Sequence, residues 1–171
     1  MYDFAEKIKL HEVEFELVPE LWERFRCDGI DLNCITWNET KFLSDDGRTL
    51  NEGMNLLPND KGGIYIFYVK CGILPNISNY LMYIGKADIT ERNSLRVRCK
   101  KYFGEYKSKE GRPKIQRLVK YWGKYLHLKY IELDDNNLIK RLEINLINSI
   151  LPPFNDYIPD KKTRDAKKAF S

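Results

Sequence analysis

The side chains that most often carry catalysis are few in this chain. Its only histidines are His11 and His127, and its cysteines lie too far apart to form CxxC pairs. These spacings argue against a Ser/His or Cys/His nucleophile and against a zinc site. No GxxxxGK[ST] loop is present to cradle nucleotide phosphates. The chemistry left open is phosphodiester hydrolysis, which needs a group that deprotonates water, a cation beside the scissile phosphate and a carboxylate for a divalent metal.

The distribution of charge along the chain points to a polyanionic partner. The chain carries 29 basic and 25 acidic residues, but residues 86–124 have a net charge of +9 and residues 161–171 of +4, whereas residues 1–60 have −8. A basic region of this size predicts a nucleic-acid surface, with the acidic N-terminal third facing elsewhere. A set of solvated helix faces is the alternative.

Length and composition predict one domain with its own core. The chain has 171 residues, of which 43% are hydrophobic. No apolar run approaches the roughly 18 residues of a membrane span, so we expect a cytoplasmic protein with no membrane partner. We expect the four cysteines to be reduced and partly buried: Cys27, Cys34, Cys71 and Cys99.

The first 60 residues are expected to form an N-terminal extension. Apolar and acidic residues alternate over 11–18, which predicts a strand, and Leu21, Trp22 and Phe25 have helical spacing. Residues 41–62 are rich in Asp, Asn and Gly and are expected to lead to a separate core.

Residues 61–160 are expected to form the main domain, followed by a basic tail over 161–171. Aromatic and β-branched runs predict a hairpin, and Pro113 and Pro152 mark the first turn of one helix and the end of another. The predicted order is strand, strand, helix, helix, strand, helix, at about 63–69, 80–84, 95–103, 113–122, 126–133 and 137–150. This order predicts a small α+β fold.

Two tripeptides lie on the consecutive predicted strands: Gly-Ile-Tyr at 63–65 and Tyr-Ile-Gly at 83–85. An arginine follows in the next helix at Arg98, a glutamate in the last helix at Glu143, and an asparagine just beyond it at Asn155. In this order, on these elements, the residues resemble the GIY-YIG nuclease family.

The resemblance covers about residues 62–158. It implies a three-stranded antiparallel sheet flanked by helices, one Mg²⁺ or Mn²⁺ ion, and hydrolysis of double-stranded DNA to 5′-phosphate and 3′-hydroxyl ends. The spacer between the tripeptides is longer than in compact members of the family, and the role of its loop at 71–79 is open.

The resemblance also assigns roles to the two tyrosines. Tyr65 matches the tyrosine proposed to activate the attacking water, and Tyr83 matches the one that orients water or phosphate. Because an unperturbed phenol has a pKa near ~10, Tyr65 needs neighbouring cations to act as a base at neutral pH. Lys86 is placed to help it.

Arg98 is preferred to Arg96 as the phosphate clamp. Arg98 lies beside the apolar stripe of its predicted helix, whereas Arg96 is rotated by ~200° and is expected to point to solvent. The family pattern places the arginine four residues before a His or Tyr, a position that Tyr102 occupies.

Glu143 and Asn155 complete the implied site. Glu143 lies in an otherwise inward-facing stripe, where a carboxylate is costly to bury unless it binds a cation such as Mg²⁺. The alternative is a surface ion pair with Lys140 or Arg141. The amide of Asn155 is expected to form hydrogen bonds within the site and to hold the last helix to the sheet, or to be mainly structural. The lysines expected to contact DNA phosphates include Lys100, Lys101, Lys107 and Lys114.

Two other interpretations compete with this one. Asp88 with Glu105 and Lys107 formally matches the D…ExK pattern of another nuclease class, but Gly104 suggests a helix end there rather than the strand that class needs. A nucleic-acid-binding module without catalysis could keep the same fold.

Within the resembled family, repair and homing nucleases join this domain to long additional DNA-binding regions. A short chain with its own extension is more similar to a restriction or phage-defence endonuclease, and a homodimer would then cut both strands. The acidic extension could form the dimer surface, or pack against the basic region when DNA is absent.

Overall fold

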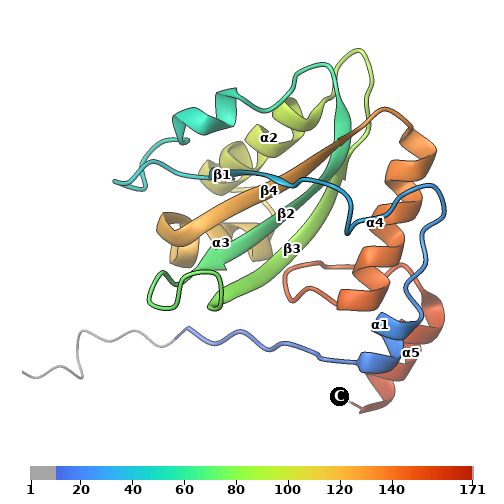
Figure 1. The fold of residues 1–171 in the computed structure, drawn as a ribbon. Helices are drawn as coiled ribbons and strands as arrows, with labels where there is room; N and C mark the ends of the chain where they lie inside the picture. The colour runs from blue at the N-terminus through green and yellow to red at the C-terminus, as the bar shows by residue number, and fades with distance from the viewer. Residues whose placement is uncertain (1–10, 171) are drawn as a thin grey trace, which may run out of the picture.

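The computed structural model describes residues 11–170 of the chain, as an α+β fold with helices on both faces of one antiparallel sheet (Figure 1). The four strands are arranged in the order β1-β4-β2-β3. They span Asn38–Lys41 (β1), Gly62–Lys70 (β2), Asn79–Ala87 (β3) and Leu126–Leu133 (β4). None of the helices within residues 11–170 is long and apolar enough to span a membrane.

The expectation of three strands is wrong, because the N-terminal extension adds β1 to the sheet. β1 pairs with β4 from Asn38 opposite Tyr130 to Lys41 opposite His127. The sequence of β1, Asn-Glu-Thr-Lys, has no apolar alternation that would predict a strand. It forms a strand because it covers an edge of β4 that would otherwise be unpaired.

The strand expected over residues 11–18 is also absent from the described structure. The segment follows an irregular path to α1, which spans Pro19–Glu23 and begins at a proline. Alternation of apolar and acidic residues produces a two-faced extended segment, but it does not supply a neighbouring strand for backbone pairing.

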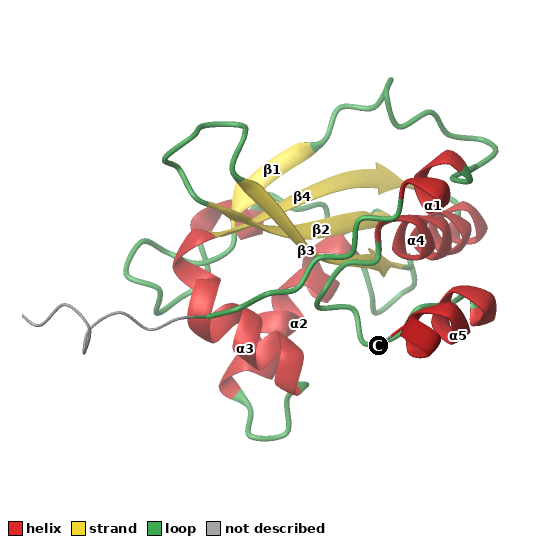
Figure 2. Ribbon diagram, turned by 90° about the horizontal axis from the view of Figure 1, so that it is seen from below, coloured by secondary structure: helices red, strands yellow, loops and turns green. Residues whose placement is uncertain are grey.

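The main helices follow the predicted pattern with changes at their ends. α2 spans Leu95–Lys107, α3 spans Pro113–Trp122 and α4 spans Asn136–Ile150. Gly104 does not end α2 as expected; the helix continues for three more residues. Short 3₁₀ turns, η2 and η3, span Glu52–Asn55 and Gly123–Tyr125. The expected basic tail forms a further helix, α5, at Lys161–Phe170, which Figure 2 shows near α1 and α4.

The alternating side chains of β2 face two separate hydrophobic clusters. Tyr65 and Phe67 pack with buried residues of α2 and α3, whereas Ile64 packs with buried residues of α4 on the other face. The first cluster also contains four residues from the extension: Phe42, Leu43, Met54 and Leu57. Residues 42–57 are therefore part of the same core as Tyr65, and not only an approach to it.

Two glycines of the tripeptides lie where a side chain has no room. A Cβ atom on Gly85 would lie 2.5–2.7 Å from atoms of the Tyr65 ring, directly opposite on β2. A Cβ atom on Gly63, whose φ is +153°, would lie 1.9 Å from the carbonyl oxygen of Ile131. Both positions therefore require glycine on steric grounds alone.

We expect Gly85→Ala to lower the free energy of unfolding by about 1–3 kcal/mol, because the added methyl group must displace the buried Tyr65 ring. Gly104→Ala is the matched control. Nothing lies within 4 Å of a Cβ atom at Gly104, inside α2, so this change should raise the free energy of unfolding by about 0.5–1 kcal/mol. Urea denaturation followed by circular dichroism measures both. Equal stability of Gly85→Ala and the parent chain would contradict the proposed contact.

Candidate active site

Three tyrosine hydroxyl groups meet beneath α2. The Tyr102 hydroxyl lies 2.6 Å from that of Tyr65 and donates a hydrogen bond to that of Tyr83 at 3.1 Å. The three side chains are 1%, 0% and 7% exposed, respectively. They meet because Tyr65 and Tyr83 occupy the same face of the β2–β3 hairpin, on which α2 packs with Tyr102 facing inward.

Arg98 adds a positive charge to this tyrosine cluster. Its Nε atom donates a hydrogen bond to the Tyr65 hydroxyl at 3.3 Å, and its guanidinium carbon lies 5.5 Å from the centre of the Tyr102 ring. The direction of the hydrogen bonds among Arg98 and the three tyrosines follows from the fact that a guanidinium group can only donate. Arg98 donates to Tyr65, so the Tyr65 hydroxyl can donate to Tyr102 and Tyr102 to Tyr83. The hydroxyl proton of Tyr83 is then left to bind another group.

Arg96, in contrast, does not point to solvent as expected. It is half-buried, and its Nε atom donates to the backbone carbonyl of Leu57 at 2.6 Å. Helical spacing correctly rotates Arg96 away from the tyrosines, but it carries no information about the chain before β2, which packs on that side of α2.

A second arginine at the cluster was not identified from the sequence. The guanidinium carbon of Arg112 lies 5.3 Å from the centre of the Tyr102 ring. Its orientation is set by two hydrogen bonds to the carboxylate of Glu105, at 2.9 and 3.1 Å. The sequence offers no signal for Arg112 beyond its charge, because the packing of α3 against α2 places it there.

Lys86 does not contact Tyr65, contrary to expectation. It follows Gly85, so the alternation of side chains along β3 turns it to the face of the sheet that packs against α4. There it forms an ion pair with Asp88. The cation beside Tyr65 is Arg98.

Burial keeps the Tyr65 phenol protonated at neutral pH. Loss of solvent raises the pKa of Tyr65 well above its usual range, the neighbouring Tyr102 and Tyr83 raise it further, and Arg98 opposes them. Burial also raises the pKa of Tyr102. The cluster as it stands therefore works as a chain of neutral hydrogen-bond donors and acceptors, and Tyr65 is not yet a base.

Glu143 approaches the same region from α4. Burial is the main cause of its raised pKa; Asp88 acts in the same direction, while the charges of Lys86 and Arg98 lower it. Within residues 11–170 Glu143 forms no ion pair with any cation. The surface pair with Lys140 or Arg141, the alternative expected from the sequence, is therefore not present there. Lys86 lowers the pKa of Glu143 more than Arg98 does, and Arg98 also opposes the raised pKa of Tyr65.

This carboxylate fits a divalent cation. A partly buried carboxylate without an ion-pair partner gains from a hard cation, and Mg²⁺ takes few protein ligands, the rest being water and phosphate oxygens. Among the described residues, no group of three or more His, Cys, Asp or Glu side chains gathers into a metal site. A site here would therefore depend mainly on Glu143.

Asn155 holds the chain after α4 against β3. Its side chain accepts a hydrogen bond from the backbone N–H of Ile84 at 3.0 Å and donates one to the Ile84 carbonyl at 2.8 Å. The backbone N–H of Phe154 adds a bond to the Met82 carbonyl at 2.9 Å. Asn155 therefore fixes the strand residues on both sides of Tyr83 and acts by positioning.

The four lysines expected to contact DNA differ in their surroundings. Lys100 donates to the side chain of Asn55 at 2.6 Å, and Lys114 donates to the carbonyl of Asn155 at 3.2 Å. Lys101 and Lys107 are exposed, and Lys107 lies over aromatic rings of α2. Lys101 and Lys107 are thus the more accessible pair.

The competing D…ExK pattern does not form a unit. Glu105 and Lys107 lie on the helix α2, where Glu105 is bound by Arg112, and Asp88 is paired with Lys86. The strand that this pattern needs is absent at these residues.

Comparison of the chain with models of protein families, with curated proteins and with solved structures finds no significant match.

Glu143→Gln should stabilise the protein in metal-free buffer, by about 1 kcal/mol at pH 7. The raised pKa means that the folded state binds more protons than the unfolded state, so the carboxylate lowers stability as pH rises above the unfolded value near ~4.3. The gain from glutamine is absent below that pH and complete above the folded pKa. Urea denaturation from pH 4 to 8 measures it, with the exposed Glu132→Gln as control. A gain that is the same at every pH would contradict the assigned cause.

Proposed function

We propose that this chain is a metal-dependent endonuclease of the GIY-YIG type that hydrolyses DNA. The observation that supports the proposal most is the convergence on Arg98. Its Nε atom donates a hydrogen bond to Tyr65, and its charge, after that of Lys86, lowers the pKa of Glu143, although Arg98, Tyr65 and Glu143 come from three different elements. A phenol, a guanidinium and an unpaired carboxylate supply the three groups that phosphodiester hydrolysis requires.

In this proposal Arg98 stabilises the charge that develops on the phosphate. A planar, permanently charged guanidinium suits the oxygens of a pentacovalent phosphate better than an ammonium group does. Glu143 would hold Mg²⁺ or Mn²⁺, which neutralises charge at the leaving oxygen when bound. Tyr83, with its free hydroxyl proton, would orient the phosphate or the water.

Tyr65 would accept the proton of the attacking water. Because its phenol is neutral in the free protein, it must release its own proton as it takes one. The hydrogen bonds from Tyr65 to Tyr102 and onward to Tyr83 offer a path: Tyr65 would pass its proton to Tyr102, Tyr102 would pass its own to Tyr83, and the Tyr83 proton would leave to solvent. Arg98, which already donates to the Tyr65 oxygen, stabilises any negative charge that appears there.

A restriction or phage-defence enzyme, acting as a homodimer, is the form of this function that we favour. A single site cuts one strand, so two copies would be needed for a double-strand break. Digestion of a defined plasmid followed by sequencing of the ends distinguishes discrete fragments from a smear, and the latter would indicate a non-specific nuclease.

We expect the chain to cleave plasmid DNA with Mg²⁺ and to stop when EDTA is added. Arg98→Ala and Glu143→Gln should each lower the cleavage rate about 100-fold or more while DNA binding persists, because both groups act in the chemical step. Arg96→Ala and Glu132→Gln are the matched controls and should cleave at near the parent rate per folded molecule. If the parent chain and the control variants bind DNA but do not cleave it, the result would favour a nucleic-acid-binding module instead.

Charge reversal at Lys101 and Lys107 should weaken binding to every DNA sequence alike. Each lost phosphate contact flattens the plot of log K against log[salt] by about 0.9, through counterion release. Fluorescence anisotropy with a labelled duplex, in EDTA and at several salt concentrations, measures the slope. An unchanged slope in the double variant would mean that these lysines form a solvated face.

A further inference from the structure

An acidic segment lies along a basic groove on the described surface. Residues 11–18 run from α1 across to α3 (Figure 2). Three carboxylates of the segment line a pocket of about 200 Å³ together with three cations. The carboxylates are Glu12, Glu14 and Glu16, and the cations are Lys114 and Arg117 of α3 and Lys167 of α5.

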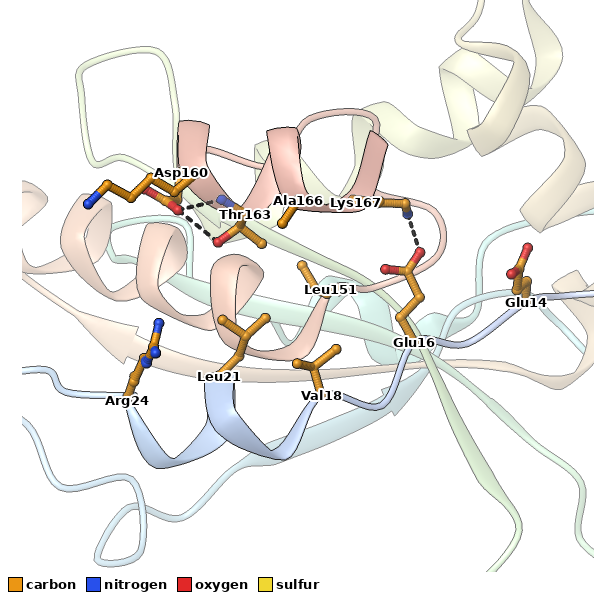
Figure 3. Close-up of a pocket in the computed structure, with 11 residues that line it drawn as sticks. Glu14, Glu16, Val18, Leu21, Arg24, Leu151, Asp160, Thr163, Ala166 and Lys167 are labelled. Atoms are coloured by element: carbon orange, nitrogen blue, oxygen red, sulfur yellow. Dashed lines mark hydrogen bonds and ion pairs between the residues drawn. The ribbon is translucent and has the colours of Figure 1, made fainter. Parts of the chain in front are cut away.

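Few contacts hold this segment in place. The described structure gives residues 11–17 no backbone–backbone hydrogen bond. The His11 ring stacks on Tyr121 with 4.0 Å between ring centres, and the Phe15 ring lies 6.1 Å from that of Tyr80. Val13 packs at the edge of the core, and Glu16 forms an ion pair with Lys167 (Figure 3). Ion pairs this close to solvent contribute only about 0–1 kcal/mol each and weaken with salt.

The groove continues beyond the segment toward the candidate active site. An adjoining pocket of about 250 Å³ is lined by Lys114, Arg164, Lys167 and Lys168, and it reaches Asn155. Asn155 binds the backbone of Ile84, the residue next to Tyr83. One carboxylate of this second pocket, Asp156, is paired with Lys114 at 3.5 Å. Cations of α3 and α5 therefore line two adjoining pockets, and the second pocket includes Asn155, which binds the backbone next to Tyr83.

α5 does not pack tightly against the body of the protein. A cavity of about 750 Å³ separates it from α1 and from residues 14–18, as Figure 3 shows. Its first turn is held by Asp160, which accepts hydrogen bonds from Thr163, and by Arg164, which donates to the carbonyls of Ile158 and Pro159. The basic end of α5 thus adjoins open space, bridged by the pair of Glu16 and Lys167.

We propose that the groove between α3 and α5 binds the phosphate backbone of nucleic acid, and that residues 12–16 occupy it as an internal competitor until nucleic acid displaces them. The three carboxylates occupy alternate positions of the segment and line the same pocket as the three cations, so they present negative charge to them. The inference rests on the proposed function, because the groove would hold the nucleic acid that the candidate active site cleaves.

Competition lowers the apparent affinity of the free protein. Only the fraction of molecules with an open groove can bind, so a segment that occupies the groove most of the time weakens binding in proportion. Salt weakens the ion pair of Glu16 with Lys167 and the attraction of the other carboxylates to the groove as well, so the closed form loses its advantage as the salt concentration rises.

The test is fluorescence anisotropy of a labelled duplex in EDTA with the full chain carrying Glu12→Gln, Glu14→Gln and Glu16→Gln. We expect roughly tenfold tighter binding than for the parent at low salt, with the two curves converging at high salt. The charge-matched control carries Glu20→Gln, Glu23→Gln and Glu132→Gln, all at exposed positions away from the groove, and should bind much like the parent. Adding Arg117→Gln and Lys167→Gln to the first variant should remove its gain.

A second measurement uses the unmodified chain. Addition of duplex should accelerate cleavage by a glutamate-specific protease after residues 12, 14 and 16, because displacement frees the segment. Equal tightening in the charge-matched control, or no tightening and no gain in protease sensitivity, would overturn the inference while leaving DNA binding and cleavage in place. Absence of DNA binding by every variant would instead refute the proposed function, and this inference with it.

Discussion

The geometry of the candidate site depends on one close contact, the Tyr65 ring lying against Gly85. The two residues face each other across β2 and β3, and the ring occupies the space that a side chain on Gly85 would need. In that position the Tyr65 hydroxyl reaches Tyr102, and through it Tyr83, while remaining within hydrogen-bond distance of Arg98. A displacement of the ring would therefore change each of these contacts together.

The site combines groups that the fold stabilises with one that it does not. The tyrosines share hydrogen bonds and ring contacts within the core, and Arg98 is held between two of them. Glu143, in contrast, is partly buried without an ion-pair partner in the described chain, and its raised pKa reflects that cost. Such a cost is common where a group must remain available to bind a ligand.

The N-terminal third of the chain has two distinct physical roles. Residues 38–57 supply a strand and four buried side chains to the core that contains Tyr65. Residues 11–18 lie on the surface with few contacts, and their negative charges face cations of α3 and α5. The acidic residues of this third of the chain are thus divided between a part that is built into the core and a weakly held surface segment. The weak hold on the surface segment is what the proposed competition with a polyanion requires.

The sequence by itself determined the elements whose information is local. β4 and α3 lie where alternation, helical spacing, proline and glycine predicted them, β2, β3 and α4 extend slightly beyond the predicted runs, and Arg98 faces Tyr65 as its place beside the apolar stripe implied. Only the tertiary structure decided the rest. β1 has no strand pattern and exists because it covers an edge of β4, whereas residues 11–18 have the pattern but no partner.

Side-chain environments were the least predictable part, because they depend on segments far apart in the sequence. Arg96 is held by the chain before β2, and Arg112 reaches Tyr102 through the packing of α3 on α2. Lys86 is different, because the alternation along β3 alone turns it away from Tyr65, so its direction was predictable from the sequence. Spacing within one element predicts the direction of a side chain, but its partner comes from another element, and only folding brings the two together.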